Sequence, residues 1–311
     1  MKTTPITTAD IARSVIAVPP LARSRDLGLD RAANLAIIKY LEGAGVRSLM
    51  YGGNANFFNI SIGEYAEVLD FLAESVGPDT WLLPSAGPDF GKLRDQAPIL
   101  RSRAFPSVMV LPVTGPSVPT GVARGIRHFA EALGKPVVLY LKDDRMLTPD
   151  LVGKLVDDRL IASVKYAVVR ADPAKDDFLR AILNRVDRSL VASGIGERPA
   201  IVHMRDFGLP SFTTGSGCVA PRASLQLLSL LKNKDYEAAE AVREAFIPLE
   251  DLPDGINPIR VLHDAVGAAG IADTGPMLPG MDNLEPADRA RVAEAAKALY
   301  AYDQTVSRAA A

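Results

Sequence analysis

Cysteine and histidine are scarce in this sequence. Its 311 residues include one cysteine, Cys218, and three histidines, His128, His203 and His263. A single cysteine excludes an internal disulfide framework and a zinc site built from cysteines, and the histidines lie too far apart for the spacing of metal ligands. We therefore expect no metal site, interpret Cys218 as a small buried thiol, and expect His128 and His203 on the surface of helices or loops.

An excess of one charge and long apolar runs are also missing. The 35 basic and 37 acidic residues are well mixed and give a net charge of −2. Without a basic stripe, nucleic acid is not an expected partner. No stretch reaches the roughly 18 apolar residues of a membrane span, and the first residues, MKTTPITTADIARSV, contain no apolar run typical of a signal peptide. We expect no membrane partner and a cytoplasmic location.

Short apolar runs rich in Val, Ile and Leu recur along the first three quarters of the chain, each followed by a stretch with helical periodicity. This alternation is typical of β-α units on a parallel sheet, and eight such units in about 230 residues favour a (β/α)8 TIM barrel over an open sheet. The predicted strands are residues 14–20, 46–52, 80–85, 107–113, 135–141, 160–167, 188–193 and 210–215.

Helices are predicted between the strands and after them. Residues 61–77 begin with a serine cap and an S-x-x-E box, and residues 148–158 begin with a threonine cap and a proline at the first helical position. Residues 29–45 have apolar positions three to four apart and end in glycines. After residue 232 only helical patterns remain, so we expect a catalytic barrel over residues 1–232 and a C-terminal helical extension over residues 233–311.

The sixth predicted strand, in the stretch IASVKYAVV, contains a lysine, Lys165. Active sites of such barrels lie at the carboxyl ends of the strands. A buried amine has a lowered pKa and can attack a ketone to form a Schiff base. The alternative is that Lys165 pairs with an acid or extends along the strand to solvent.

Other polar residues fall at strand ends. Tyr140 ends the fifth strand, next to the strand of Lys165, where a phenol could move protons; alternatively it packs at the barrel rim. Gly52 and Gly53 follow the second strand and permit close approach of a ligand to the backbone, or only a tight turn. Thr114 follows the fourth strand, and Thr213 lies at the eighth.

Taken in order, these segments resemble the dihydrodipicolinate synthase and N-acetylneuraminate lyase family of Schiff-base-forming barrels. The resemblance rests on GGNANFFNIS after the second strand, VVLYL, ASVKYA and NPIRVLHDAVGAAGIADTGPMLPGM near the carboxyl end. It implies that Lys165 is the Schiff-base lysine, that Tyr140 relays protons and that Gly53 and Asn54 bind the substrate carboxylate. It also implies that Thr213 borders the keto-acid pocket.

The resemblance further implies a place for Arg145, where the synthases bind the carboxylate of the second substrate. The sequence departs from the synthases, however, in the turn Gly53-Asn54-Ala55-Asn56, which lacks the adjacent threonines and the acid of the synthase turn. The aromatic residue that follows the fourth strand of synthases is also missing, and Thr114 is nearest to its place. The segments around Phe57-Phe58 and YLKDDRMLTPD look more like the keto-deoxy sugar-acid dehydratases and aldolases.

The function expected from pattern and resemblance is a class I lyase that forms a lysine Schiff base with pyruvate or another 2-keto acid. Its reaction would be aldol cleavage or dehydration of a keto-deoxy sugar acid. One alternative is 4-hydroxy-tetrahydrodipicolinate synthase, which condenses pyruvate with aspartate semialdehyde; another is a barrel that binds a keto acid without turnover. The mechanism needs no cofactor, and the family resemblance implies a homotetramer.

Overall fold

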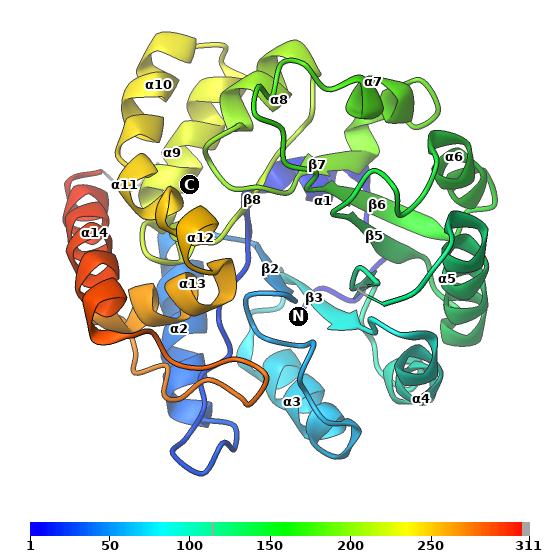
Figure 1. The fold of residues 1–311 in the computed structure, drawn as a ribbon, viewed down its shortest axis with the longest axis horizontal. Coiled ribbons are helices and arrows are strands. Elements are labelled where there is room, and N and C mark those ends of the chain that lie inside the picture. The colour runs from blue at the N-terminus through cyan, green and yellow to red at the C-terminus, as the bar shows by residue number, and fades with distance from the viewer. Residues whose placement is uncertain (114, 307–311) are drawn as a thin grey trace.

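A computed structural model describes residues 1–113 and 115–306 of the chain. Eight parallel strands run in the order β7-β6-β5-β4-β3-β2-β1-β8. Ser193 at the end of β7 pairs with Phe212 just before β8, and its amide donates to the carbonyl of Ser211, so the two ends of the sheet meet. The predicted (β/α)8 TIM barrel is confirmed, and Figure 1 shows the helices arranged around the strands.

Each strand falls at one of the predicted apolar runs. Because helices cover the outer face and side chains fill the barrel, these strands are buried on both faces, which explains their nearly continuous apolar sequences. Their bounds are β1 Ile16–Ala17, β2 Ser48–Tyr51, β3 Trp81–Ala86, β4 Val108–Val110, β5 Val137–Leu141, β6 Ile161–Tyr166, β7 Val191–Ser193 and β8 Thr213–Thr214.

The helices between the strands begin at the expected caps. Ser61 and Glu64 form the predicted capping box of α3, and Thr148 caps α6 with Pro149 at its first position. The seventh unit, where the helical period is weakest, has a helix of only seven residues, α8. The helices up to β8 are α1 Thr8–Arg13, α2 Arg31–Ala44, α3 Ile62–Ser75, α4 Phe90–Arg101, α5 Pro119–Leu133, α6 Pro149–Asp157, α7 Asp177–Leu183 and α8 Ala200–Asp206, with a short 3-10 helix at Arg188–Leu190.

After β8 the described chain continues only as helices, which lie together on one side of the barrel (Figure 1). Asp303 of α14 accepts hydrogen bonds from the Arg222 side chain and the Ala223 amide of α9, so the last helix is tied to the barrel. Their bounds are α9 Pro221–Lys232, α10 Tyr236–Glu244, α11 Ile247–Glu250, α12 Leu252–Gly255, α13 Pro258–Ala268 and α14 Pro286–Thr305, with a 3-10 helix at Ser216–Cys218 before α9.

None of the helices in the described ranges combines the length and the apolar character that crossing a bilayer requires. The same residues contain no cluster of three or more histidine, cysteine, aspartate or glutamate side chains placed to hold a metal ion.

Candidate active site

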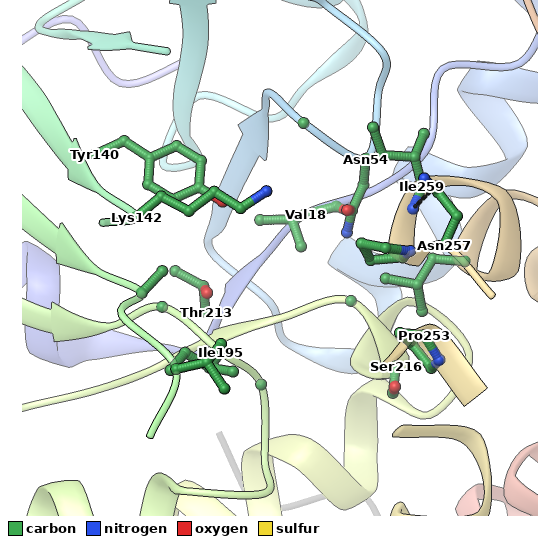
Figure 2. Close-up of a pocket in the computed structure, with 18 of the residues that line it drawn as sticks. Val18, Asn54, Tyr140, Lys142, Ile195, Thr213, Ser216, Pro253, Asn257 and Ile259 are labelled. Atoms are coloured by element: carbon green, nitrogen blue, oxygen red, sulfur yellow. Dashed lines mark hydrogen bonds between the residues drawn. The ribbon is translucent and has the colours of Figure 1, made fainter. Parts of the chain in front are cut away.

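A cavity of about 550 Å³ lies at the carboxyl ends of the strands. Its wall comes from β6, from the segments that follow β2, β5, β7 and β8, and from the chain between α11 and α13 (Figure 2). This is the end of a (β/α)8 barrel that carries active sites. Five of the seven predicted site residues line it, namely Gly53, Asn54, Tyr140, Lys165 and Thr213.

Lys165 lies on β6 and faces this cavity. The side chain is 6% exposed, and in the part of the chain that the structure describes no carboxylate forms an ion pair with its amine. Burial lowers the pKa of Lys165 to about 7, and the positive charge of Lys142 contributes to the lowering. The lysine therefore neither extends to solvent nor pairs with an acid. Near neutral pH, a large fraction of it is the neutral amine that attacks carbonyl carbons.

Tyr140 is the neighbour of Lys165 across the sheet. The register of β5 and β6 pairs the two residues, and the Lys165 amine lies 4.3 Å from the centroid of the Tyr140 ring. Burial raises the pKa of the Tyr140 phenol to about 12, so the phenol carries its proton at neutral pH. A protonated phenol beside a neutral amine can donate to an oxygen that develops charge on a bound carbonyl.

The turn after β2 approaches the cavity from the other side. The Asn56 and Phe57 amides donate to the carbonyls of Gly53 and Gly52, which closes the turn, and the Asn54 side chain donates to the Val18 carbonyl over 3.2 Å. A Cβ at Gly52 would lie 2.9 Å from the Ser85 hydroxyl, so a glycine is needed for this packing. Helix α3 begins only at Ile62, so the amides of this turn do not belong to a helix amino terminus.

Thr213 lines the cavity at β8. It is 2% exposed and pairs with Ile16 of β1 in the sheet. The carboxyl end of the eighth strand thus contributes a hydroxyl to the same cavity as Lys165 (Figure 2).

Arg145 does not join the other candidates. Its guanidinium donates to both oxygens of Asp143, over 3.0 Å and 2.6 Å, the side chain is 88% exposed, and the residue does not line the cavity. The two-residue spacing of Asp143 and Arg145 favours this local pair in the loop after β5. Thr114, the other remaining candidate, lies outside the described residues.

His203 corrects an expectation from the sequence, because it is buried and not at the surface. It lies on the inner face of α8, its Nδ1 is 2.8 Å from the Ser193 hydroxyl, and its ring meets Tyr166 and Phe207 edge-on. Burial lowers the pKa of His203 to about 4, which keeps the ring neutral. His128 is exposed and Cys218 is buried, as expected.

Several charged residues of the cavity were not selected from the sequence. Lys142 follows Tyr140 by two positions and therefore shares its face of the strand, a period-two signal that could have identified it. Figure 2 shows its amine pointing toward the middle of the cavity. Glu250 and Arg198 also line the cavity. Glu250 comes from a helix far along the chain, and nothing in its sequence context indicates a catalytic site.

The chain is similar to curated proteins over most of its length. It is 26% identical over 278 residues to a 4-hydroxy-tetrahydrodipicolinate synthase of Stutzerimonas stutzeri, which covers 86% of this chain and 92% of that protein. It is 20% identical over 245 residues to a probable 5-dehydro-4-deoxyglucarate dehydratase of Acinetobacter baumannii, which covers 76% and 78%. No family model matches the chain.

Among solved structures, the chain resembles a dihydrodipicolinate synthase from Oceanobacillus iheyensis. The TM-score is 0.79 at 22% identity, and the superposition covers 94% of this chain and 98% of that one. At this level of identity the similarity describes the fold, including the helices that follow the barrel.

Proposed function

We propose that this chain, which belongs to the dihydrodipicolinate synthase and N-acetylneuraminate lyase family of class I aldolase barrels, forms a Schiff base between Lys165 and a 2-keto acid. As a family member it is an enzyme of the carbon–carbon or carbon–oxygen lyase type. The state of Lys165 is the observation that carries the proposal. A buried lysine without an acidic partner, with a pKa lowered to about 7, has an amine available for attack at neutral pH.

The first steps use residues that already face one another. The neutral Lys165 amine attacks the keto carbon, and the oxygen takes one proton from the amine nitrogen and one from the Tyr140 phenol and leaves as water. The Gly53–Asn54 turn and Thr213 offer an amide, a side-chain amide and a hydroxyl to the substrate carboxylate. The resulting iminium withdraws electrons from the next carbon, so that a bond two atoms away can break.

Trapping with borohydride tests this step. Reduction of the protein in the presence of pyruvate should fix the keto acid on Lys165, and peptide mass analysis should locate the adduct there. Lys165→Met should give none, whereas Lys154→Met, on the exposed face of α6, should trap as the wild type does. An absence of adduct with pyruvate and with longer 2-keto acids would falsify the Schiff-base proposal. Pyruvate binding without an adduct would instead indicate a binding barrel.

The substrate we propose is a keto-deoxy sugar acid, which undergoes aldol cleavage or dehydration. The turn after β2 has no hydroxyl side chain, and Arg145 is engaged with Asp143 outside the cavity. Both features argue against the condensation with aspartate semialdehyde. That reaction remains the second candidate, because the relative with 26% identity is a 4-hydroxy-tetrahydrodipicolinate synthase. Consumption of pyruvate with aspartate semialdehyde, measured beside a panel of keto-deoxy sugar acids, distinguishes the two.

We also propose the homotetramer implied by the family, which sedimentation velocity would measure.

A further inference from the structure

Two glutamate side chains are buried together beside the cavity. Glu197 follows β7 and is 0% exposed; Glu250 is the last residue of α11, is 8% exposed and lines the cavity. The two residues are in contact, since the Glu197 amide donates to the Glu250 carboxyl. Such a pair is unusual in a protein interior, since two ionised carboxylates in contact repel each other and both lose their hydration.

The hydrogen bonds divide the two carboxyls into different roles. Glu197 accepts on one oxygen, Oε1, from the hydroxyls of Thr214, over 2.6 Å, and Ser224, over 2.5 Å. Its other oxygen, Oε2, is buried and has no hydrogen-bond partner among the described residues. Glu250 accepts from the amides of Glu197, over 3.1 Å, and Arg198, over 2.7 Å.

Burial and mutual repulsion together keep a proton on this pair. Burial raises the pKa of Glu250 well above the ordinary carboxyl range, and the Glu197 charge raises it further; burial also raises the pKa of Glu197. One charged group nearby is the Arg198 guanidinium, which donates to the Glu250 carbonyl and pairs with Asp251 and Asp254. Arg243 also lies near Glu250. Within the described ranges neither arginine forms an ion pair with the two carboxyls, because Arg198 pairs with the two aspartates and Arg243 with Glu240.

The loop after β7 connects this pair to the lysine. A Cβ at Gly194 would lie 2.9 Å from Cγ of Lys165, and one at Gly196 would overlap Oε1 of Glu250. Gly196 also has a positive φ of 86°, so glycine suits both its backbone and its contact. The two glycines are two residues apart, a span of about 7 Å at most. The loop therefore contacts both residues, and the side chains of Lys165 and Glu250 line the same cavity.

We propose that Glu250 is the acid that protonates the departing hydroxyl of a 4-hydroxy-2-keto acid bound to Lys165, so that the enzyme is a dehydratase. This inference rests on the proposed Schiff base. In aldol cleavage the hydroxyl at the fourth carbon must lose its proton, whereas in dehydration it must gain one. A carboxylic acid that holds a proton at the cavity wall assists the second outcome.

The proposed step balances in atoms and electrons. The iminium lets the third carbon lose a proton to Tyr140 or water, and the electron pair left behind forms the double bond between the third and fourth carbons. The bond between the fourth carbon and its oxygen breaks, and the oxygen keeps the two electrons of that bond. The oxygen then takes the proton from Glu250 and leaves as water. The amides of Glu197 and Arg198 stabilise the Glu250 carboxylate. The proton released from the third carbon then returns through solvent to the two glutamates. Glu197 acts through Glu250 and is a positioning residue.

Two variants separate the roles. Glu250→Gln keeps one oxygen that accepts from one of the two amides, and its side chain cannot give up a proton. Glu197→Gln keeps Oε1 for Thr214 and Ser224 and removes the charge that raises the pKa of Glu250. Glu244→Gln, at an exposed site on α10, is the matched control. Each protein is assayed for pyruvate trapping by borohydride, and for water loss and pyruvate release from 4-hydroxy-2-keto sugar acids, over a range of pH.

The wild type and Glu244→Gln should trap pyruvate and lose water from the sugar acids. Glu250→Gln should still trap pyruvate but lose water about 10²- to 10⁴-fold more slowly, the usual contribution of a general acid. Glu197→Gln should retain water loss at low pH, with the alkaline limb of its pH profile moved to lower pH. A purely structural role would leave that limb in place.

Three results would overturn the inference. One is a wild type that traps pyruvate but cleaves the sugar acids or leaves them intact, which contradicts the role of Glu250 and leaves the Schiff base standing. The second is water loss at the wild-type rate in Glu250→Gln. The third is a wild type that traps no keto acid at all, in which case the proposed function fails and the role of Glu250 fails with it.

Discussion

Replacing Lys165 with methionine should stabilise the folded protein at neutral and acidic pH. Burial lowers the pKa of this amine to about 7 from an ordinary value of 10.5. Because one pKa unit corresponds to about 1.4 kcal/mol, the lowering costs the folded state about 5 kcal/mol when both folded and unfolded chains are protonated. Methionine has a similar length and no charge, so Lys165→Met should recover up to that amount at about pH 6.

The pH dependence separates this effect from better packing. Between about pH 7 and 10.5 the unfolded chain binds a proton at Lys165 that the folded chain does not, so wild-type stability rises with pH in this window. The advantage of the variant should therefore shrink, by roughly 3 kcal/mol between about pH 6 and pH 9. Urea unfolding of both proteins at several pH values measures the difference, and contributions from titrating groups that do not interact with Lys165 cancel in it.

Lys154→Met serves as the control for removing a lysine in general, since Lys154 is exposed on α6. Its stability relative to the wild type should not vary with pH in this window. If the difference between Lys165→Met and the wild type is equally flat, Lys165 is an ordinary charged lysine in the folded protein. The physical basis of the proposed Schiff base would then be lost, whatever the size of the stabilisation.

Two further changes test the groups around the lysine. Tyr140→Phe keeps the ring against the Lys165 amine and removes the phenol proton. Borohydride trapping of pyruvate in a single turnover should therefore slow by about 10²-fold or more while the protein stays folded. An unchanged rate would exclude Tyr140 as the proton donor. Asp176→Asn weakens the acceptor of the 2.6 Å hydrogen bond from the Tyr166 hydroxyl and leaves Arg170 without its buried partner. The melting temperature should therefore fall by an amount equivalent to about 1–3 kcal/mol. An equal melting temperature would show that these contacts of Asp176 do not stabilise β6.

The sequence was sufficient to locate the barrel strands, because a parallel strand covered on both faces is a nearly uninterrupted apolar run bounded by polar residues. The same property made Lys165 stand out in the sequence, because a charged side chain is rarely buried in such an apolar run. What the sequence could not decide was whether Lys165 pairs with an acid, since pairing depends on which side chains other strands bring to the same depth.

The cavity residues that were missed have two different physical origins. Lys142 lies two positions after Tyr140, and the alternation of side chains along a strand was enough to place it beside the cavity. Glu250 lies on α11, and its meeting with Glu197 depends on how the last helices turn back over the β7 end of the barrel. That packing involves contacts between residues 53 positions apart, which no local pattern encodes. Arg145 shows the reverse case, where a local pair with Asp143 outweighs the family pattern.

The charge pattern of the cavity explains why two normally ionised groups are kept neutral there. The 2-keto acid that we propose as substrate carries a negative charge and would enter a cavity that is lined on one side by Lys142. A charged Lys165 would attract the substrate but could not attack it, and an ionised glutamate pair would repel it. Burial removes both difficulties because it disfavours the charged form of each group. The amine of Lys165 loses its proton and becomes a nucleophile, while the carboxyl pair keeps a proton and becomes an acid. Because each pKa moves toward neutrality from its own side, a single desolvated cavity can hold the base and the acid that a dehydration requires at the same pH.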